Sequence, residues 1–385
     1  MPTPIAPEAQ TAPVADPALM AKLSRFIGSG ADRPGFLARG PIENAVIRQM
    51  TDAVGDRNPI YTDEAFARGT VHKGLVAPPM WLYSWMMHGL RPDDEESTLA
   101  DGTAYFHLAP SGQRRAPAET RTIRDELNDL LEEYGYSTPA VTNIAQTYLR
   151  YLRPGERPRF SSWIIDDVVG PKATKLGEGF FVTQRINVFV EDQLVATVRQ
   201  VYLRSKPAKG KKAADSLADQ VRPALPVDHD GAAPIAGPAR RRTETLRFET
   251  VKAGDVLPAL VVKISPTLII AGALASQDFQ DLHHDYLVMP RRGHPQIFMN
   301  AMTTSGLLGR FVTDWTGPEA LVREYEMQLL RPNYAGDTMR ITGTVRSAAV
   351  TDGRGLVTLD LIGHNSLGTH TQSRVVVELP VQRGS

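Results

Sequence analysis

The sequence predicts an α+β fold in which two related domains each wrap an antiparallel sheet around one central helix. The chain has 385 residues, more than one ordinary hydrophobic core organises, so two domains are expected. A segment rich in Pro, Gly, Ala and charge, residues 206–242, has little strand or helix patterning and marks the boundary. Each half repeats one order of elements: an acidic loop, a helix, then strands rich in Val, Ile, Thr and aromatic residues.

In the second half, residues 260–276 are interpreted as strand material leading to Asp278. Residues 296–312 are interpreted as a buried, mostly apolar helix. Strands are expected to follow, because β-branched runs are separated by turn signals such as Asp352-Gly353. These strands cover residues 322–330, 338–350, 355–366 and 373–381.

The first half has the same layout with one addition. Residues 47–59 lead into a loop, and residues 74–90 are interpreted as the central helix. A charged helix is expected near residues 120–134. Strands are expected at residues 146–152, 160–169, 179–192 and 193–205. The two halves therefore look like a diverged tandem duplication.

These patterns define four regions. Residues 1–18 are rich in Pro and Ala and are expected to be a disordered leader, because they lack the basic and apolar parts of a signal peptide. Residues 19–205 form the first domain, residues 206–242 a linker and residues 243–385 the second domain.

Composition excludes several classes of protein. Forty-three basic residues balance forty-three acidic ones, so no overall field favours nucleic acid or an anionic membrane. The absence of cysteine excludes disulfides, zinc ribbons, iron–sulfur clusters and thiol nucleophiles, and it fits a reducing compartment. No apolar run reaches the roughly 18 residues of a membrane span. We therefore expect a cytoplasmic protein with no membrane or nucleic-acid partner.

The candidate catalytic residues lie before the second-half helix. Asp278 and His283 are five residues apart in "SQDFQDLHHD", and a helix opens near Met299-Asn300. A carboxylate and a histidine on one loop can act as general base and acid. A helix N-terminus can hold a developing negative charge with a free backbone N–H.

This spacing resembles the signature of MaoC-like enoyl-CoA hydratases, Asp-x-Asn-Pro-aliphatic-His, with Gln280-Asp281 where the family has Asn-Pro. The resemblance implies a double hot-dog fold and a hydratase whose catalytic pair is Asp278 and His283. It places Asn300 where the family has a glycine that donates its backbone amide to the thioester oxygen. It also implies that no cofactor is needed, because CoA is part of the substrate.

The first half carries a degenerate copy of this site. "VGDRNPIY" contains Asp56, but Tyr61 occupies the histidine position. Pro78 and Pro79 flank the position of the amide donor, and proline has no N–H to donate. We expect the first half to be catalytically silent and to accommodate the substrate.

The wider resemblance covers nearly the whole chain. Residues 142–182 resemble the amino-terminal MaoC-like subunit, and residues 276–318 the small catalytic subunit, of two-subunit hydratases of bacterial steroid side-chain degradation. The resemblance implies that this chain is the two subunits fused. It also implies a bulky enoyl-CoA substrate of the 17-ene-20-carboxyl type, used in sterol or bile acid degradation.

Several other residues have two interpretations. Arg291 and Arg292 either bind the phosphates of CoA or lie in a solvated loop. Lys172 and Lys175 either contact CoA or belong to a polar hairpin. Trp81 and Trp85 either line the acyl pocket or fill the core. No metal site is expected, although His283 has possible metal-ligating neighbours, which are His284, Asp285 and His294.

The function also has alternatives to hydration. A hot-dog fold can support thioester hydrolysis, and a chain of this kind can be a non-catalytic acyl-CoA-binding subunit of an aldolase or thiolase. The expected ligand in every case is an acyl-CoA thioester. A homodimer of the fused chain is the expected assembly, with an aldolase or thiolase as a possible neighbour.

Overall fold

The computed structural model describes residues 16–382 except positions 88, 93–96, 99–103, 106–107, 111–120, 175–176, 207–240 and 293. The predicted linker therefore lies almost wholly outside the described residues, as does the predicted leader up to residue 15. Helix α1 (Pro17–Leu23) begins before the predicted end of the leader, because the Asp16 side chain accepts hydrogen bonds from the first free amides of this helix.

One antiparallel sheet runs through both halves. The first half supplies β1, β7, β9, β10, β6 and β8, and the second half supplies β12, β15, β14, β13 and β11, in the order β1-β7-β9-β10-β6-β12-β15-β14-β13-β11 with β8 paired to β9. The two halves meet where β6 pairs with β12, with Ile144 opposite Met327 and Gln146 opposite Tyr325. The sequence predicts most of these strands, because their residues have strong β propensity and because hairpin turns connect them.

The bounds of the strands are as follows. In the first half they are β1 (Phe36–Leu37), β6 (Thr138–Tyr148), β7 (Arg159–Phe160), β8 (Ile164–Thr174), β9 (Gly177–Val190) and β10 (Gln193–Ser205). In the second half they are β11 (Val256–Lys263), β12 (Leu321–Leu329), β13 (Thr338–Thr351), β14 (Arg354–Asn365) and β15 (Gly368–Leu379). Two short pairs stand apart, β2 (Leu90–Pro92) with β5 (Leu108–Pro110), and β3 (Ser97–Thr98) with β4 (Ala104–Tyr105).

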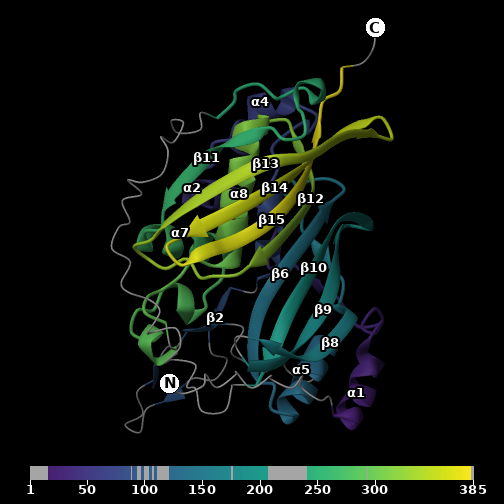
Figure 1. Cartoon of the computed structure of the whole chain (residues 1–385), viewed down its shortest axis with the longest axis vertical. Helices are drawn as coiled ribbons and strands as arrows, with labels where there is room; N and C mark the ends of the chain where they lie inside the picture. The colour runs from purple at the N-terminus through teal and green to yellow at the C-terminus, as the bar shows by residue number, and fades with distance from the viewer. Residues whose placement is uncertain are drawn as a thin grey trace, which may run out of the picture.

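The second-half sheet wraps around helix α8 (Ala301–Thr316), as predicted, and its strands cross in front of this helix in Figure 1. The prediction of strand over residues 260–276 is wrong beyond Lys263. Residues 266–276 form helix α7 (Pro266–Ser276), with Ser265 as N-cap and Pro266 in the first turn. Both are helix-start signals, but the continuous apolar run that follows them was interpreted as a strand.

The first half departs further from the predicted layout. In place of a helix over residues 74–90, it has the short 3₁₀ helix η2 (Pro79–Met86), which begins at Pro79 with Pro78 as its N-cap. Residues 44–54 form helix α2 (Asn44–Val54), which ends at Gly55 in the left-handed conformation. It is followed by α3 (Pro59–Thr62) and α4 (Glu64–Gly69). The predicted charged helix is α5 (Ile123–Glu133).

The buried apolar residues form two clusters. The larger, which we call the main core, combines α8, η2 and α2 with the inner faces of strands from both halves, so the halves share one interior. The smaller, the outer core, joins α1 and α5 to β8, β9 and β10 of the first half. No helix in the described part of the chain combines the length and apolar character required to cross a membrane.

Candidate active site

Asp278 lies directly after helix α7. Gln277 takes the left-handed conformation (φ 59°) at the helix C-terminus, and the Asp278 amide donates to the Ala273 carbonyl at 2.9 Å. This C-terminal turn directs the carboxylate inward, where the residue is 3% exposed.

His283 lies on the short 3₁₀ helix η6 (Asp281–His283) and is also buried. Its Nδ1 is 2.7 Å from the Phe298 carbonyl oxygen, and because a carbonyl only accepts, Nδ1 carries the proton of this bond. Nε2 therefore faces the Asp278 carboxylate, with 3.4 Å between Nε2 and Oδ2. The structure thus brings together the two residues that the sequence singles out.

Asn300 is the N-cap of α8 and also contacts the Asp278 carboxylate. Its Oδ1 accepts from the Thr303 backbone N–H at 2.8 Å, and a backbone N–H only donates, so the orientation of the amide is fixed. Its Nδ2 consequently donates to Asp278 Oδ2 at 3.2 Å and to Ser276 Oγ at 2.8 Å. The sequence predicted only a backbone role for Asn300. An Asn at a helix start is an N-cap signal that would have indicated the side-chain role.

The backbone N–H of Asn300 is a further donor at the site. It has no hydrogen-bond partner within the described ranges of the chain, and it stands at the N-terminus of a helix of 16 residues. The free amide and the helix dipole both favour a negatively charged oxygen at this position.

Asp278 is held in its charged form. Burial alone would raise the pKa of this carboxyl. The hydrogen bond and charge that His283 supplies in its protonated form, together with the Asn300 amide, outweigh burial, and the pKa lies below its usual range. Oδ1 is buried and has no partner within hydrogen-bond geometry among the described residues, although the Gln280 backbone N–H lies near enough to help lower the pKa of the carboxyl.

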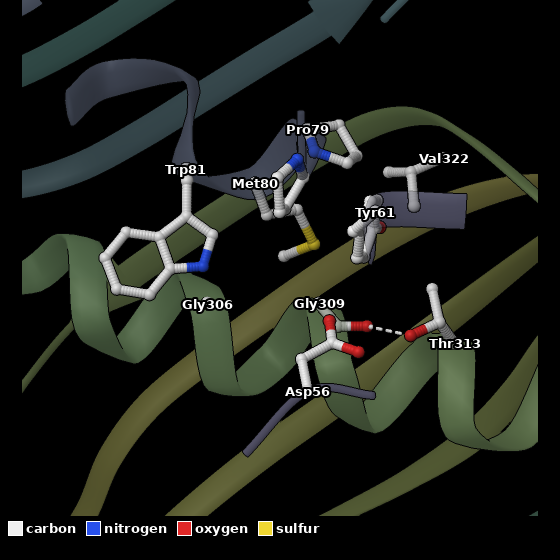
Figure 2. Close-up of a pocket in the computed structure, with 10 residues that line it drawn as sticks. Asp56, Tyr61, Pro79, Met80, Trp81, Gly306, Gly309, Thr313 and Val322 are labelled. Atoms are coloured by element: carbon white, nitrogen blue, oxygen red, sulfur yellow. Dashed lines mark hydrogen bonds between the residues drawn. The ribbon is translucent and has the colours of Figure 1, made fainter. Parts of the chain in front are cut away.

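The first-half counterpart contains Asp56, Tyr61 and Pro78, which line a small cavity together with residues of α8; Figure 2 labels Asp56 and Tyr61 in it. Burial and the nearby charge of Asp314 raise the pKa of Asp56 to about 6, and Tyr61 is 3% exposed. The remaining cavity has a volume of about 10 Å³, at the limit for one water molecule. This geometry lacks a histidine and, at Pro78 and Pro79, a backbone donor.

The other residues with two interpretations lie in different environments. Trp81 is 1% exposed and packs on Gly306 of α8, which favours the core role that the sequence left open. Trp85 is partly buried, and its Nε1 has no partner among the described residues. Lys172 is exposed on β8, and Lys175 lies outside the described residues. Arg291 and Arg292 belong to the 3₁₀ helix η7 (Met289–Arg292), and their side chains are not described.

The residues weighed as metal ligands have other partners. His294 Nδ1 bonds the Tyr334 hydroxyl at 2.9 Å, and Asp285 Oδ1 accepts from the Leu287 amide at 2.8 Å. Across the described ranges, no group of three or more His, Asp or Glu side chains has the arrangement of a metal site.

Comparison with known proteins identifies relatives of both halves. Two are from Mycobacterium tuberculosis: the 3-oxo-4,17-pregnadiene-20-carboxyl-CoA hydratase alpha subunit, 39% identical over 189 residues, and the beta subunit, 43% identical over 126 residues. These matches cover 48% and 33% of this chain, with 51% of the alpha and 95% of the beta subunit. The chain thus spans about half the length of the alpha subunit, and it looks like a fusion of the two subunits.

Family and structure comparisons agree on the fold. The model of a FAS1-like dehydratase domain region matches residues 38–104. A MaoC-like dehydratase structure superimposes with a TM-score of 0.59 at 16% identity, covering 94% of this chain and 100% of that one. A conserved hypothetical Mycobacterium tuberculosis protein with a double hot-dog fold gives a TM-score of 0.53 at 15% identity, covering 91% and 98%. The predicted double hot-dog fold is therefore confirmed.

Proposed function

The chain belongs to the MaoC-like family that includes the two 3-oxo-4,17-pregnadiene-20-carboxyl-CoA hydratase subunits, and from this premise we propose that it adds water to the 2,3 double bond of an enoyl-CoA. One observation carries the proposal. An ionised Asp278 and the Nε2 of His283 face each other beside a free backbone N–H at the N-terminus of α8. These are the base, acid and oxyanion donor that hydration requires.

The tautomer of His283 suggests where water binds. With the proton on Nδ1, neutral His283 presents a lone pair at Nε2, and the ionised Asp278 also presents only acceptors. Two acceptors 3.4 Å apart do not bond each other directly, but one water molecule can donate a hydrogen to each. In our proposal this water is the nucleophile, and the pair both orients and deprotonates it.

The proposed reaction is a syn addition. The water oxygen bonds to the β-carbon as the pair takes one of its protons, and electron density moves through the double bond onto the thioester oxygen. The Asn300 amide stabilises that oxygen. The pair then delivers a proton to the α-carbon, so the product carries the hydroxyl and the hydrogen of one water molecule. The reaction as proposed requires no cofactor.

We propose a bulky acyl group as the substrate. The relatives' names describe a 3-oxo-4,17-pregnadiene-20-carboxyl group, and a related alpha subunit from Thermomonospora curvata is named a probable enoyl-CoA hydratase, 27% identical over 232 residues. The short η2 and the silent first half support a site adapted to a large substrate. We further infer a homodimer of the fused chain in the cytoplasm, with an aldolase or thiolase as a possible neighbour.

The test uses a panel of straight-chain and polycyclic enoyl-CoAs, following the loss of the conjugated-enoyl absorbance. Asp278→Asn and His283→Ala are each expected to lower turnover at least ~10²-fold, as removal of a general acid–base group does. His284→Ala, a change at the exposed neighbouring histidine, is the matched control and should retain wild-type turnover.

Other outcomes would identify the alternatives. Near wild-type rates in both variants would refute the catalytic pair. Release of free CoA without hydroxyacyl-CoA would indicate a thioesterase. Binding of acyl-CoA without any turnover would indicate a non-catalytic subunit.

A further inference from the structure

Two buried glutamines interrupt an otherwise apolar face of the first-half sheet. Gln184 on β9 and Gln200 on β10 are opposite each other in the ladder and are 0% and 2% exposed. On one side of them the same face carries Val182 and Tyr202 of the outer core, and on the other side Ile186 and Val198 of the main core. The glutamines therefore form a polar seam between the two apolar clusters.

The seam continues as a chain of hydrogen bonds to η2. Gln184 Nε2 donates to Gln200 Oε1 at 2.7 Å, and Gln200 Nε2 donates to the Tyr83 hydroxyl at 3.1 Å. No acceptor for the Tyr83 O–H is found in the described part of the chain, and Gln184 Oε1 is buried without a partner there. We call Tyr83, Gln200 and Gln184 the relay.

The open ends of the relay point to a missing ligand. A buried polar atom without a hydrogen bond is costly, whereas an apolar residue of similar volume would pack without that cost. Tyr83 is only partly buried, so of the three residues it is the one accessible to a bound molecule. Its hydroxyl accepts from Gln200 and is free to donate, which suits a carbonyl oxygen.

The relay lies on the same face as the candidate active site but at a distance from it. Met327 on β12 is opposite Ile144 on β6, which is opposite Gln200 on β10. These three residues form a row across the strands. Beside Met327, the hydroxyl of Tyr325 on the same strand contacts both Met327 Sδ and Ser305 Oγ of α8. Two strand spacings then separate Met327 from Gln200, which is about 10 Å.

The other end of η2 leads back to the catalytic loop. Gly89, which follows η2, lies against Gln277, because a Cβ at Gly89 would be 3.0 Å from Gln277 Oε1. Gln277 directly precedes Asp278. In the proposal below, the acyl group extends from the α8 N-terminus along η2 toward Tyr83.

We propose that the Tyr83 hydroxyl, oriented by Gln200 and Gln184, binds a carbonyl oxygen at the end of the acyl group remote from the thioester. Tyr83 contacts the substrate, while the glutamines are positioning residues. The inference rests on the proposed function for the identity of the substrate as an acyl-CoA. It adds a specificity determinant in the half that lacks the catalytic pair.

The test measures binding separately from turnover. The probes are a saturated polycyclic acyl-CoA with a ketone on the ring farthest from the carboxyl group, and its analogue without that ketone. Wild type should bind the ketone about 10-fold more tightly by calorimetry, and Tyr83→Phe should abolish this preference while leaving affinity for the analogue unchanged. Gln200→Met should have the same effect, and adding it to Tyr83→Phe should cause no further loss, because the two residues act together.

Tyr148→Phe is the matched control. Tyr148 is a buried tyrosine of the same sheet that also bonds a glutamine, but its hydroxyl donates to Gln146 Oε1 at 2.7 Å. This variant should keep the full preference for the ketone. Equal binding of the two probes by wild type, or a preference that survives in Tyr83→Phe, would overturn the inference. That result differs from a failure of the proposed function, which would be absence of hydration despite ketone-selective binding.

Discussion

The side chain of Asn300 joins a helix cap to the candidate catalytic carboxylate. Its side-chain oxygen accepts from the Thr303 backbone N–H and so caps α8, while its side-chain nitrogen donates to Asp278. A glycine would provide the backbone N–H at this position but neither of these bonds. The residue therefore couples the stability of the helix to the ionisation of Asp278.

Substitution of Asn300 separates these two roles. Asn300→Ser can still cap α8 but cannot also reach Asp278, so the pKa of Asp278 should rise. The pH profile of kcat/KM reports Asp278 and His283 as a pair, because the proposed reaction needs the first ionised and the second neutral. The measurement is therefore an NMR titration of the Asp278 carboxyl in wild type and variant.

Asn300→Ala is the companion variant. It should show the same rise in the pKa of Asp278 and, in addition, lose about 1 kcal/mol of stability with the cap. An Asp278 pKa that stays at the wild-type value in both variants would contradict the assigned role of the amide.

At this scale the sequence predicts the identity of the pair but not what supports it. The spacing of Asp278 and His283 on one loop was sufficient to bring them together. The Phe298 carbonyl that fixes the tautomer of His283 could not be foreseen, because a backbone group carries no sequence signal. The relay was also missed. The two-residue period of a strand places Gln184 and Gln200 on the same inward face as Val182 and Tyr202, but their polar side chains gave no indication that they are buried there.

At the scale of elements, α8 makes close contact with the first half through two glycines. A Cβ at Gly306 would be 2.4 Å from the ring of Trp81, whereas a Cβ at Gly309 would be 3.3 Å from Met80 Sδ. The indole is rigid and buried, but the thioether is flexible. An added methyl group should therefore be tolerated at Gly309 but not at Gly306, although the two positions are only three residues apart on one helix.

Gly306→Ala should destabilise the protein by about 1–3 kcal/mol, because displacement of Trp81 outweighs the gain of up to about 1 kcal/mol in helix propensity. Gly309→Ala should be near neutral, since Met80 can move. Urea unfolding of both variants measures the difference. Equal effects at the two positions would mean that Trp81 does not limit the approach of η2 to α8.

The elements also show where sequence patterning succeeds. Strands β10, β13 and β14 were predicted nearly to their ends, because turn residues and β-branched runs coincide, whereas β15 begins five residues before its predicted start. Helix α7 was mistaken for a strand, because periodicity does not separate a fully buried helix from a buried strand. The first-half helix was overextended because the effect of Pro78 and Pro79 on the whole segment was underestimated.

At the scale of the whole molecule, the halves are joined by a charged cluster as well as by the continuous sheet. Arg310 of α8 donates to the Val54 carbonyl at the end of α2 at 2.6 Å and pairs with Asp314 at 3.3 Å. Asp56, which follows α2, lies near both of these charges. The first-half counterpart of the candidate site is thus part of the contact between the halves, an arrangement that the loop motif alone did not predict.

Asp56→Asn should stabilise the protein at high pH only. Burial and the charge of Asp314 raise the pKa of Asp56 to about 6. An unfolded aspartate titrates near 3.9, so between these values the folded state binds the extra proton and wild-type stability falls as pH rises. Above about pH 6, Asp56 is ionised in both the folded and the unfolded state. Its buried charge then lowers the free energy of unfolding by on the order of 2–3 kcal/mol. Asparagine removes this deficit and can still accept from the Asn58 amide, as Asp56 Oδ1 does at 2.9 Å.

Urea unfolding at pH 8 and at pH 4 measures the effect. The variant should exceed wild type at pH 8, and the difference should vanish near pH 4, where the folded-state carboxyl is protonated. Asp52→Asn, at an exposed position on α2, is the control and should show no pH-dependent gain. A variant that is less stable than wild type at both pH values would show instead that the charge of Asp56 stabilises the junction through Arg310, and the two halves would then be held together partly by an ion pair.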